Sequence, residues 1–341
     1  MAKGVKTITV IGGGLAGLSL GIGLRRAGIP VELHEASNYP RHRVCGEFIS
    51  GLGAETVKAL GLETALEGCL EHQSSVWFVR GKRIFSGRLP VAARAISRFE
   101  LDMRLMELFV DLGGRMHQRS RFMEEDGEGL VWAAGRQRVR ASTWVGLKAH
   151  FLKVPMAEGL EMHLGDGLYI GLTLIEGERV NVCGLMRGPI NIAKKGSDML
   201  LELMRLRGLG ELAERLGAGA VDPASFTGVS ALGFGKADDG DGFRLGDAHS
   251  LIPPFTGNGM TMAFQAAETA LPLLVSYANG DSGWEEAVDQ LRRRLQARFG
   301  RRLRAAAFLH PFLTKPLAQT VLSVGGRLGC LPFQRLYHAV R

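Results

Sequence analysis

The stretch that decides the fold is Val10-Ile11-Gly12-Gly13-Gly14-Leu15-Ala16-Gly17-Leu18-Ser19-Leu20. It follows apolar and β-branched residues at 6–11, which predict a strand, and it leads into a helix predicted over 15–27. A second apolar run at 31–35 predicts a neighbouring parallel strand. A strand, a glycine-rich turn, a helix and a second strand in this order form the βαβ unit that binds the diphosphate of a dinucleotide.

The glycines of this turn have separate roles in such a unit. Gly12 permits the tight turn, Gly14 lets a diphosphate approach the backbone, and Gly17 lets helix and strand pack closely. The first N–H groups of the helix then face the phosphate charge. Glu35 ends the second strand, where a carboxylate accepts from a ribose 2′-hydroxyl, and this favours an FAD- or NAD-type adenosine over a 2′-phosphate. The predicted contacts of this unit are Gly12, Gly14, Leu15, Ala16, Gly17, Glu35 and Ala36.

A second informative stretch lies more than two hundred residues later, at 243–263. A strand there ends in Gly246-Asp247, a loop rich in Pro and Gly follows, and a helix is predicted from 258 to 277. Such a loop aims backbone N–H groups and a helix dipole at one point, and Asp247 can accept from a hydroxyl of a ribityl-like chain. A second site for the far end of the dinucleotide indicates FAD. The predicted contacts are Asp247, Pro254, Gly257, Asn258, Gly259 and Met260.

Composition limits the class of protein. The chain has 341 residues, 46% of them hydrophobic, which is enough for one large or two interleaved domains. Its four cysteines form no CxxC pair, so no metal site and no disulfide framework are predicted, and a cytoplasmic location is expected. The N-terminus leads directly into the first strand without room for a signal peptide, and no apolar run reaches transmembrane length.

The C-terminal residues 284–341 are predicted to be helical and are strongly basic. No Asp or Glu follows Asp289, and the residues after it carry more positive charge than the chain's net +8. Two interpretations stay open: a packed helical cap with a solvated basic face, and peripheral contact with an anionic membrane surface. No nucleic-acid partner is expected. The apolar residues expected to face the membrane are Phe299, Leu303, Phe308 and Phe312.

The middle of the chain predicts a second sheet. Alternation within 143–151 puts Lys148 and His150 on one face of a strand, together with Trp144 and Gly146. A hairpin turn is predicted at Asp126-Gly127. Several antiparallel strands in this part of the chain indicate a sheet separate from the first. The predicted strands are 116–123, 129–133, 138–140, 143–151, 160–164, 169–175 and 180–185.

Separated segments of the chain together resemble one family. Residues 12–17 with Glu35, the segment Arg43-Val44-Cys45-Gly46-Glu47, and residues 246–259 are similar to segments of a group of FAD-dependent oxidoreductases. This group contains geranylgeranyl reductases, flavin-dependent halogenases and aromatic-ring monooxygenases, and the resemblance covers roughly residues 1–275. It implies FAD as the cofactor, with Arg43 and Cys45 beside it and Arg98 at the start of a second cofactor-side helix.

The resemblance also implies an α/β fold and a division of the chain. A Rossmann-like FAD domain of the glutathione-reductase type would be interleaved with a mainly antiparallel β-sheet substrate domain, and a helical region would follow. The expected boundaries are 1–50, 96–143 and 236–275 for the FAD domain, 51–95 and 144–235 for the substrate domain, and 276–341 for the basic helical tail.

The leading functional hypothesis is a monooxygenase that hydroxylates a small apolar or aromatic, secondary-metabolite-like substrate through a flavin C4a-hydroperoxide. Two alternatives stay open: a flavin-dependent reductase of carbon–carbon double bonds in a prenyl or polyketide chain, and a non-catalytic or partner-modifying FAD-binding protein. The residues expected at the substrate side are Cys45, Lys148, His150 and Tyr169, with His150 as the acid–base candidate.

Two departures from the family pattern bear on these hypotheses. The halogenase motif Trp-x-Trp-x-Ile-Pro is absent, which argues against halogenation. Ala133-Ala134-Gly135 stands in place of the Asp-Gly pair of aromatic hydroxylases. The electron donor, NAD(P)H or a separate reductase, is therefore left open, as is the oligomeric state.

Overall fold

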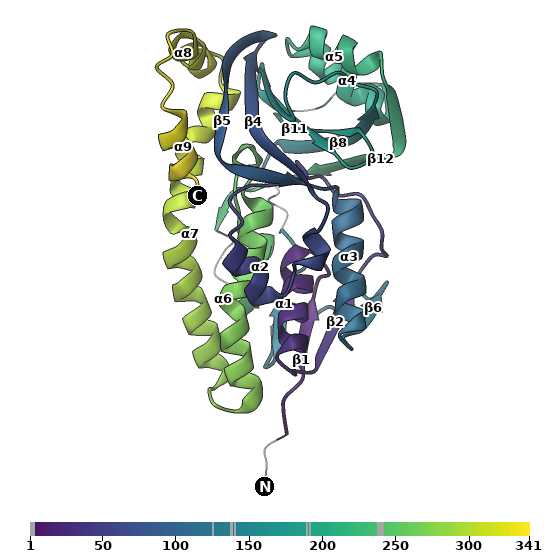
Figure 1. The fold of residues 1–341 in the computed structure, drawn as a ribbon, viewed down its shortest axis with the longest axis vertical. Helices are drawn as coiled ribbons and strands as arrows, with labels where there is room; N and C mark the ends of the chain where they lie inside the picture. The colour runs from purple at the N-terminus through teal and green to yellow at the C-terminus, as the bar shows by residue number, and fades with distance from the viewer. Residues whose placement is uncertain are drawn as a thin grey trace.

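The computed structural model describes residues 4–124, 126–136, 139, 141–188, 190, 192–236 and 242–341. A parallel sheet with its helices forms one end of the molecule and a larger sheet forms the other (Figure 1). The C-terminal helices run along one side, next to both (Figure 1).

The smaller sheet is parallel and is built around the glycine-rich turn. Its strand order is β14-β7-β1-β2-β6, so the first strand of the chain lies at the centre. Helix α1 follows that strand and is buried on nearly all sides, because it packs between the sheet and the helices α3 and α6. The bounds are β1 Ile8–Ile11, α1 Leu15–Arg26, β2 Val31–Glu35, α3 Arg98–Asp111, β6 Arg115–Gln118, β7 Leu130–Trp132, β14 Phe243–Arg244 and α6 Gly259–Asn279.

The larger sheet has the order β12-β8-β11-β10-β9-β4-β5-β3, in which only the pair β4 and β9 is parallel among the described strands. Helices α4 and α5 pack on it over an apolar core of their own. The bounds are β3 Phe48–Ile49, β4 Leu70–Val79, β5 Lys82–Ala95, β8 Trp144–Leu152, β9 Leu160–Gly165, β10 Leu168–Ile175, β11 Arg179–Arg187, α4 Gly196–Leu206, α5 Gly210–Gly217 and β12 Ala220–Ser230. Short elements complete the fold: α2 Ala54–Leu60, the pair β13 Gly235–Lys236 and β15 Ser250–Leu251, and 3₁₀ turns at Thr64–Leu66, Gly246–Ala248 and Pro254–Thr256.

The tail consists of α7 Trp284–Thr314, α8 Pro316–Arg327 and α9 Phe333–Ala339. Helix α7 packs first against α6 and then against β9 and β10, so it ties the two sheets together. Phe299 is buried in this contact and Leu303 packs against the same core, so the apolar face predicted for the membrane is wrong at these two positions. None of the helices in the described part of the chain is both long and apolar enough to span a bilayer.

The predicted α/β fold with a mainly antiparallel second sheet is confirmed, but the hairpin predicted at Asp126-Gly127 is wrong. The strands on either side of it, β6 and β7, each pair in parallel with other strands, β6 with β2 and β7 with β1. The chain between them therefore crosses over from one side of the sheet to the other. The strand predicted at 138–140 lies outside the described residues except for position 139.

Candidate active site

A cavity of about 550 Å³ lies where β1 and β2 meet the N-termini of α1 and α6. Residues from both glycine-rich segments line it, although more than two hundred positions separate them in the sequence. The predicted contacts that line this cavity are Gly12, Gly14, Leu15, Ala16, Glu35, Ala36, Arg43, Cys45, Arg98, Asp247, Pro254, Gly257, Gly259 and Met260. Two predicted contacts, Gly17 and Asn258, do not.

Three glycines show why the first turn needs this residue type. Gly12 has φ +107°, and a Cβ there would collide with the carbonyl of Ala133. A Cβ at Gly17 would collide with the carbonyl of Gly12, so Gly17 allows close packing and touches no ligand. A Cβ at Gly14 would meet no atom within 4 Å and would point into open space beside the cavity.

Both helices that end at the cavity leave their first N–H groups uncapped. Helix α1 begins after Gly14, which has no side chain to cap it. Helix α6 begins after Asn258, whose amide turns away and donates to the carbonyl of Val340. The prediction that Asn258 contacts the cofactor is therefore not supported by its position, whereas Gly259 and Met260, the first residues of α6, line the cavity.

Two carboxylates, those of Glu35 and Asp247, line the cavity. Glu35 accepts from the backbone N–H groups of Gly13 and Ser37, both at 2.9 Å, and from Arg41 at 2.6 Å. Burial alone would raise the pKa of Glu35, but Arg41 and the two N–H groups hold that pKa below its ordinary value. Asp247 is accessible from the cavity, and desolvation by the surrounding walls raises the pKa of its carboxyl.

A second cavity of about 450 Å³ lies between the larger sheet and the tail helices. Its walls are almost entirely apolar. Phe48 lines both cavities, and the neighbours Pro254 and Phe255 line one each. The aromatic residues of this apolar cavity are Phe48, Trp77, Phe85, Phe255, Phe308, Phe312, Phe333 and Tyr337.

Known proteins share this fold. No family model matches the chain. A 6-methylpretetramide 4-monooxygenase from Streptomyces rimosus is 28% identical over 80% of this chain and 76% of that protein. The flavin-dependent brominase Bmp2 superposes with a TM-score of 0.77 at 17% identity, over 98% of this chain and 94% of that one. The probable FAD-dependent monooxygenase pqsL of Pseudomonas aeruginosa gives 0.72 at 15% identity, over 95% and 100%.

The chain is similar in sequence to that monooxygenase, and its fold is the fold of these FAD-dependent monooxygenases and flavin-dependent halogenases. The predicted resemblance is thereby confirmed, and the FAD dependence of these neighbours supports the predicted cofactor and an oxidoreductase activity.

The first cavity fits FAD in its chemistry. The open space at Gly14 and the uncapped start of α1 would receive the diphosphate, and Glu35 would accept from the adenosine ribose. Asp247 would accept from the ribityl hydroxyls, and the N-terminus of α6 would face the polar edge of the flavin ring. The cavity thus offers one polar group for each part of the cofactor.

The four residues predicted at the substrate side do not line one cavity together. Cys45 lines the FAD cavity, and desolvation raises the pKa of its thiol, which stays neutral near pH 7. Tyr169 is buried, and its hydroxyl accepts from the N–H of Phe255 at 3.2 Å. Lys148 and His150 line neither cavity, because both side chains are buried against Glu47.

Glu47 is the residue that sequence reasoning passed over. Its Oε1 accepts from Lys148 Nζ at 3.1 Å and from the backbone N–H of Arg98 at 3.0 Å, and its Oε2 lies 2.6 Å from His150 Nε2. Lys148 also contacts His42 at 3.1 Å; burial and Lys148 lower the pKa of His42 to about 4, so His42 is neutral and accepts. The signal in the sequence was the position of Glu47 directly after Cys45-Gly46.

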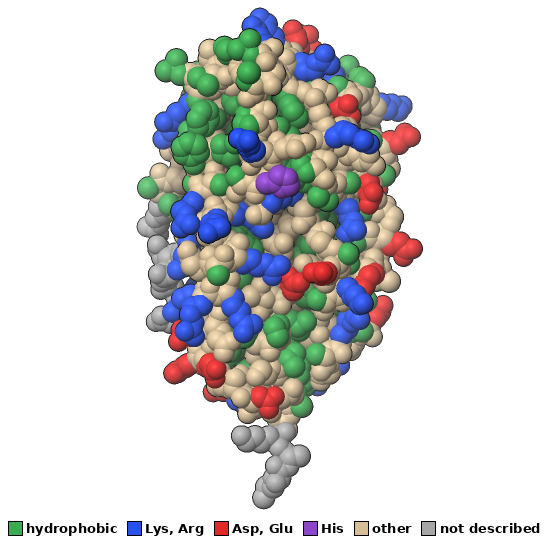
Figure 2. All heavy atoms as spheres, turned by 60° about the vertical axis from the view of Figure 1, so that its left-hand side comes forward, with side chains coloured by type: hydrophobic (Ala, Val, Ile, Leu, Met, Phe, Trp, Pro, Cys, Tyr) green, Lys and Arg blue, Asp and Glu red, His purple; other side chains and the backbone are tan. Residues whose placement is uncertain are grey.

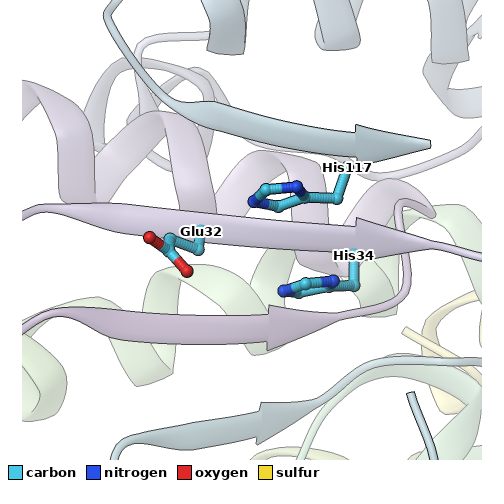
Figure 3. Close-up of side chains that lie close together, drawn as sticks. All are labelled: Glu32, His34 and His117. Atoms are coloured by element: carbon cyan, nitrogen blue, oxygen red, sulfur yellow. The ribbon is translucent and has the colours of Figure 1, made fainter. Parts of the chain in front are cut away.

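Three potential metal ligands meet at the edge of the FAD cavity, where none was expected. Ligand atoms of Glu32, His34 and His117 lie within 4.8 Å of one another on strands β2 and β6 (Figure 3). The two rings are stacked with an angle of 13°, so their in-plane lone pairs run side by side and do not converge on one point. Glu32 is paired with Arg115 at 2.9 Å. The stacked rings of His34 and His117 are therefore better described as a structural contact between β2 and β6. His34 also lines the FAD cavity.

Proposed function

We propose that this enzyme is a monooxygenase that hydroxylates a flat, apolar, aromatic substrate of the polyketide type. The observation that carries the proposal is the aromatic-lined cavity next to the FAD cavity, with Phe48 between them. A ring system bound there would be sandwiched between aromatic side chains and shielded from water. Support for the substrate class comes from the sequence relative that acts on 6-methylpretetramide.

FAD, when bound and reduced, supplies the activation of molecular oxygen. The chain's own contribution is positioning. Glu35, Asp247 and the two helix N-termini hold the cofactor, and the apolar walls orient the substrate and exclude water. Glu161 is a carboxylate in the wall of the apolar cavity, but His163 and Arg215 lower its pKa to about 2 against the effect of burial. It therefore stays ionised near pH 7 and is not a proton donor.

The apolar cavity also favours one alternative, reduction of a double bond in a prenyl or polyketide chain, because such a chain would fit the same walls. Halogenation is disfavoured by the missing Trp-x-Trp-x-Ile-Pro motif. We further propose the cytoplasm as the location, since all four cysteines are free.

The deciding experiment follows the fate of oxygen. The FAD-loaded enzyme is reduced with NADH, NADPH or a separate flavin reductase and mixed with aromatic polyketides under ¹⁸O₂. The proposal expects products that carry one ¹⁸O atom and expects no product without oxygen. Loss of a substrate double bond without oxygen consumption would establish the reductase instead. An FAD-loaded protein that converts neither kind of substrate would favour a non-catalytic role.

A further inference from the structure

Helix α8 carries a row of exposed apolar side chains. Leu317, Val321, Val324 and Leu328 follow one another at intervals of four, three and four residues, so they share one face of the helix. They are 86%, 63%, 52% and 69% exposed. Phe308 of α7, 72% exposed, adds an aromatic ring to the apolar surface of the tail.

The opposite face of α8 packs against the rest of the protein. Gln319 is buried and donates to the carbonyls of Gly165 and Leu313, at 2.7 and 2.9 Å. Gly326 lies so close to β5 that a Cβ would collide with the carbonyl of Ile84. Helix α8 packs against the protein through this face. Its row of apolar side chains therefore faces outward.

Basic side chains lie at both ends of α8 and beside Phe308. Lys315 precedes α8 and Arg327 lies in its last turn, while Arg301 and Arg304 lie on the exposed side of α7 near Phe308. Figure 2 shows hydrophobic side chains gathered over this part of the molecule, with Lys and Arg side chains among and below them and a few Asp or Glu side chains at its upper edge. No Asp or Glu follows Asp289 in the sequence. A second copy docked on the same face would oppose like charges, whereas an anionic surface would complement them.

The apolar cavity reaches this surface. Phe308 and Val321 are exposed and also line the cavity, whose far wall includes Phe48 and Phe255 near the FAD site. The apolar cavity therefore extends from α7 and α8 to residues beside the FAD cavity.

We propose that Phe308, Leu317, Val321, Val324 and Leu328, flanked by Arg301, Arg304, Lys315 and Arg327, bind the surface of an anionic lipid bilayer. The apolar side chains enter the boundary between headgroups and acyl chains, and the basic side chains contact the headgroups. An apolar substrate dissolved in the bilayer then reaches the cavity without crossing water. This substrate route rests on the proposed function, whereas the membrane contact does not.

The test measures binding of the FAD-loaded protein to vesicles by flotation. One set of vesicles is phosphatidylcholine alone and the other contains phosphatidylglycerol as well. We expect binding to the anionic vesicles, weakened by salt, and at least tenfold weaker binding for Leu317→Ser/Val321→Ser and for Lys315→Glu/Arg327→Glu. The matched control Val5→Ser/Val110→Ser changes two exposed valines far from α8 and should bind like the unchanged protein.

Flavin content and thermal stability of each variant verify that it is folded. The proposal is overturned if the unchanged protein ignores anionic vesicles, or if the α8 variants bind as well as the control. It is also overturned if the protein is a dimer that the Leu317→Ser/Val321→Ser variant separates into monomers, since the face would then join two copies. Because none of these readouts involves turnover, failure of the proposed function would leave them unchanged.

Discussion

His150 Nε2 lies 2.6 Å from Oε2 of Glu47, and neither side chain is exposed to solvent. The other carboxylate oxygen holds Lys148. Through this contact the larger sheet, which carries Lys148 and His150, holds the loop that places Cys45 and Gly46 in the wall of the FAD cavity. Lys148 and His150, two of the four residues predicted at the substrate side, thus position the loop beside the FAD cavity.

Replacing Glu47 should lower the free energy of unfolding of the protein. In Glu47→Gln the ammonium group of Lys148 remains buried without its counter-charge, and loss of one partner of a buried ion pair costs about 3–5 kcal/mol. Urea unfolding should show this loss, together with weaker retention of FAD. Glu107→Gln, on the exposed side of α3, is the matched control. Equal stability of the two variants would show that the buried cluster does not hold the loop.

The same pair predicts a pH dependence. His150 and Lys148 outweigh burial and hold the pKa of Glu47 below its ordinary value in the folded protein. A carboxyl with a lowered pKa stabilises the fold above its unfolded pKa of about 4.3, and this stabilisation disappears as the pH falls. The difference in melting temperature between the unchanged protein and Glu47→Gln should therefore be full at pH 7 and narrow below about pH 4. A constant difference across this range would contradict the assignment.

Gly14 offers a test of the FAD site with a close internal control. Gly14 and Gly53 both precede a helix in extended conformation, and a Cβ at either position meets no atom within 4 Å. Only Gly14 lines the FAD cavity. Gly14→Val should weaken FAD binding at least a hundredfold, about 2.7 kcal/mol, in a flavin fluorescence titration, while Gly53→Val should leave it unchanged. Full FAD binding by Gly14→Val would exclude the diphosphate from this turn.

The apolar cavity can be reduced in volume without disturbing the fold. Gly171 lies in β10 and lines this cavity, and the nearest atom to a Cβ there is the carbonyl of Cys183 at 3.8 Å. Gly171→Leu should lower kcat/KM for a multi-ring substrate at least tenfold, about 1.4 kcal/mol, with an unchanged flavin content. A single-ring analogue should be affected less. An equal loss for both substrates would mean that the substrate binds elsewhere.

The cofactor half of the site could be predicted because short sequence patterns determine the turns and helix starts that form it. Gly12 needs a positive φ, and its neighbours in the sequence fix the turn in which it sits. Asn258 shows the limit of this reasoning. Its residue type and its position before a helix suggested a ligand contact. Its side-chain amide instead donates a hydrogen bond to the carbonyl of Val340, a contact with a distant part of the chain that no local pattern could indicate.

The substrate half could not be predicted, because its walls come together only in the tertiary structure. Helical spacing identifies apolar faces on the tail but not what covers them. Phe299 is buried where α7 meets the core around α6, whereas Phe308, nine residues later, is exposed. Strand alternation correctly placed Lys148 and His150 on the same face, yet the loop that covers this face and supplies Glu47 comes from another part of the chain.

The side chain of Phe48 separates the FAD cavity from the apolar cavity. It borders both cavities, and its ring lies so close to Gly257 that a Cβ there would collide with it. A change at Phe48 would alter the space for cofactor and substrate together, so this position is poorly suited to engineering of selectivity. Trp77 and Phe333 border the apolar cavity and not the FAD cavity. Libraries that aim to change which molecule the enzyme accepts should vary those positions and keep Phe48 fixed.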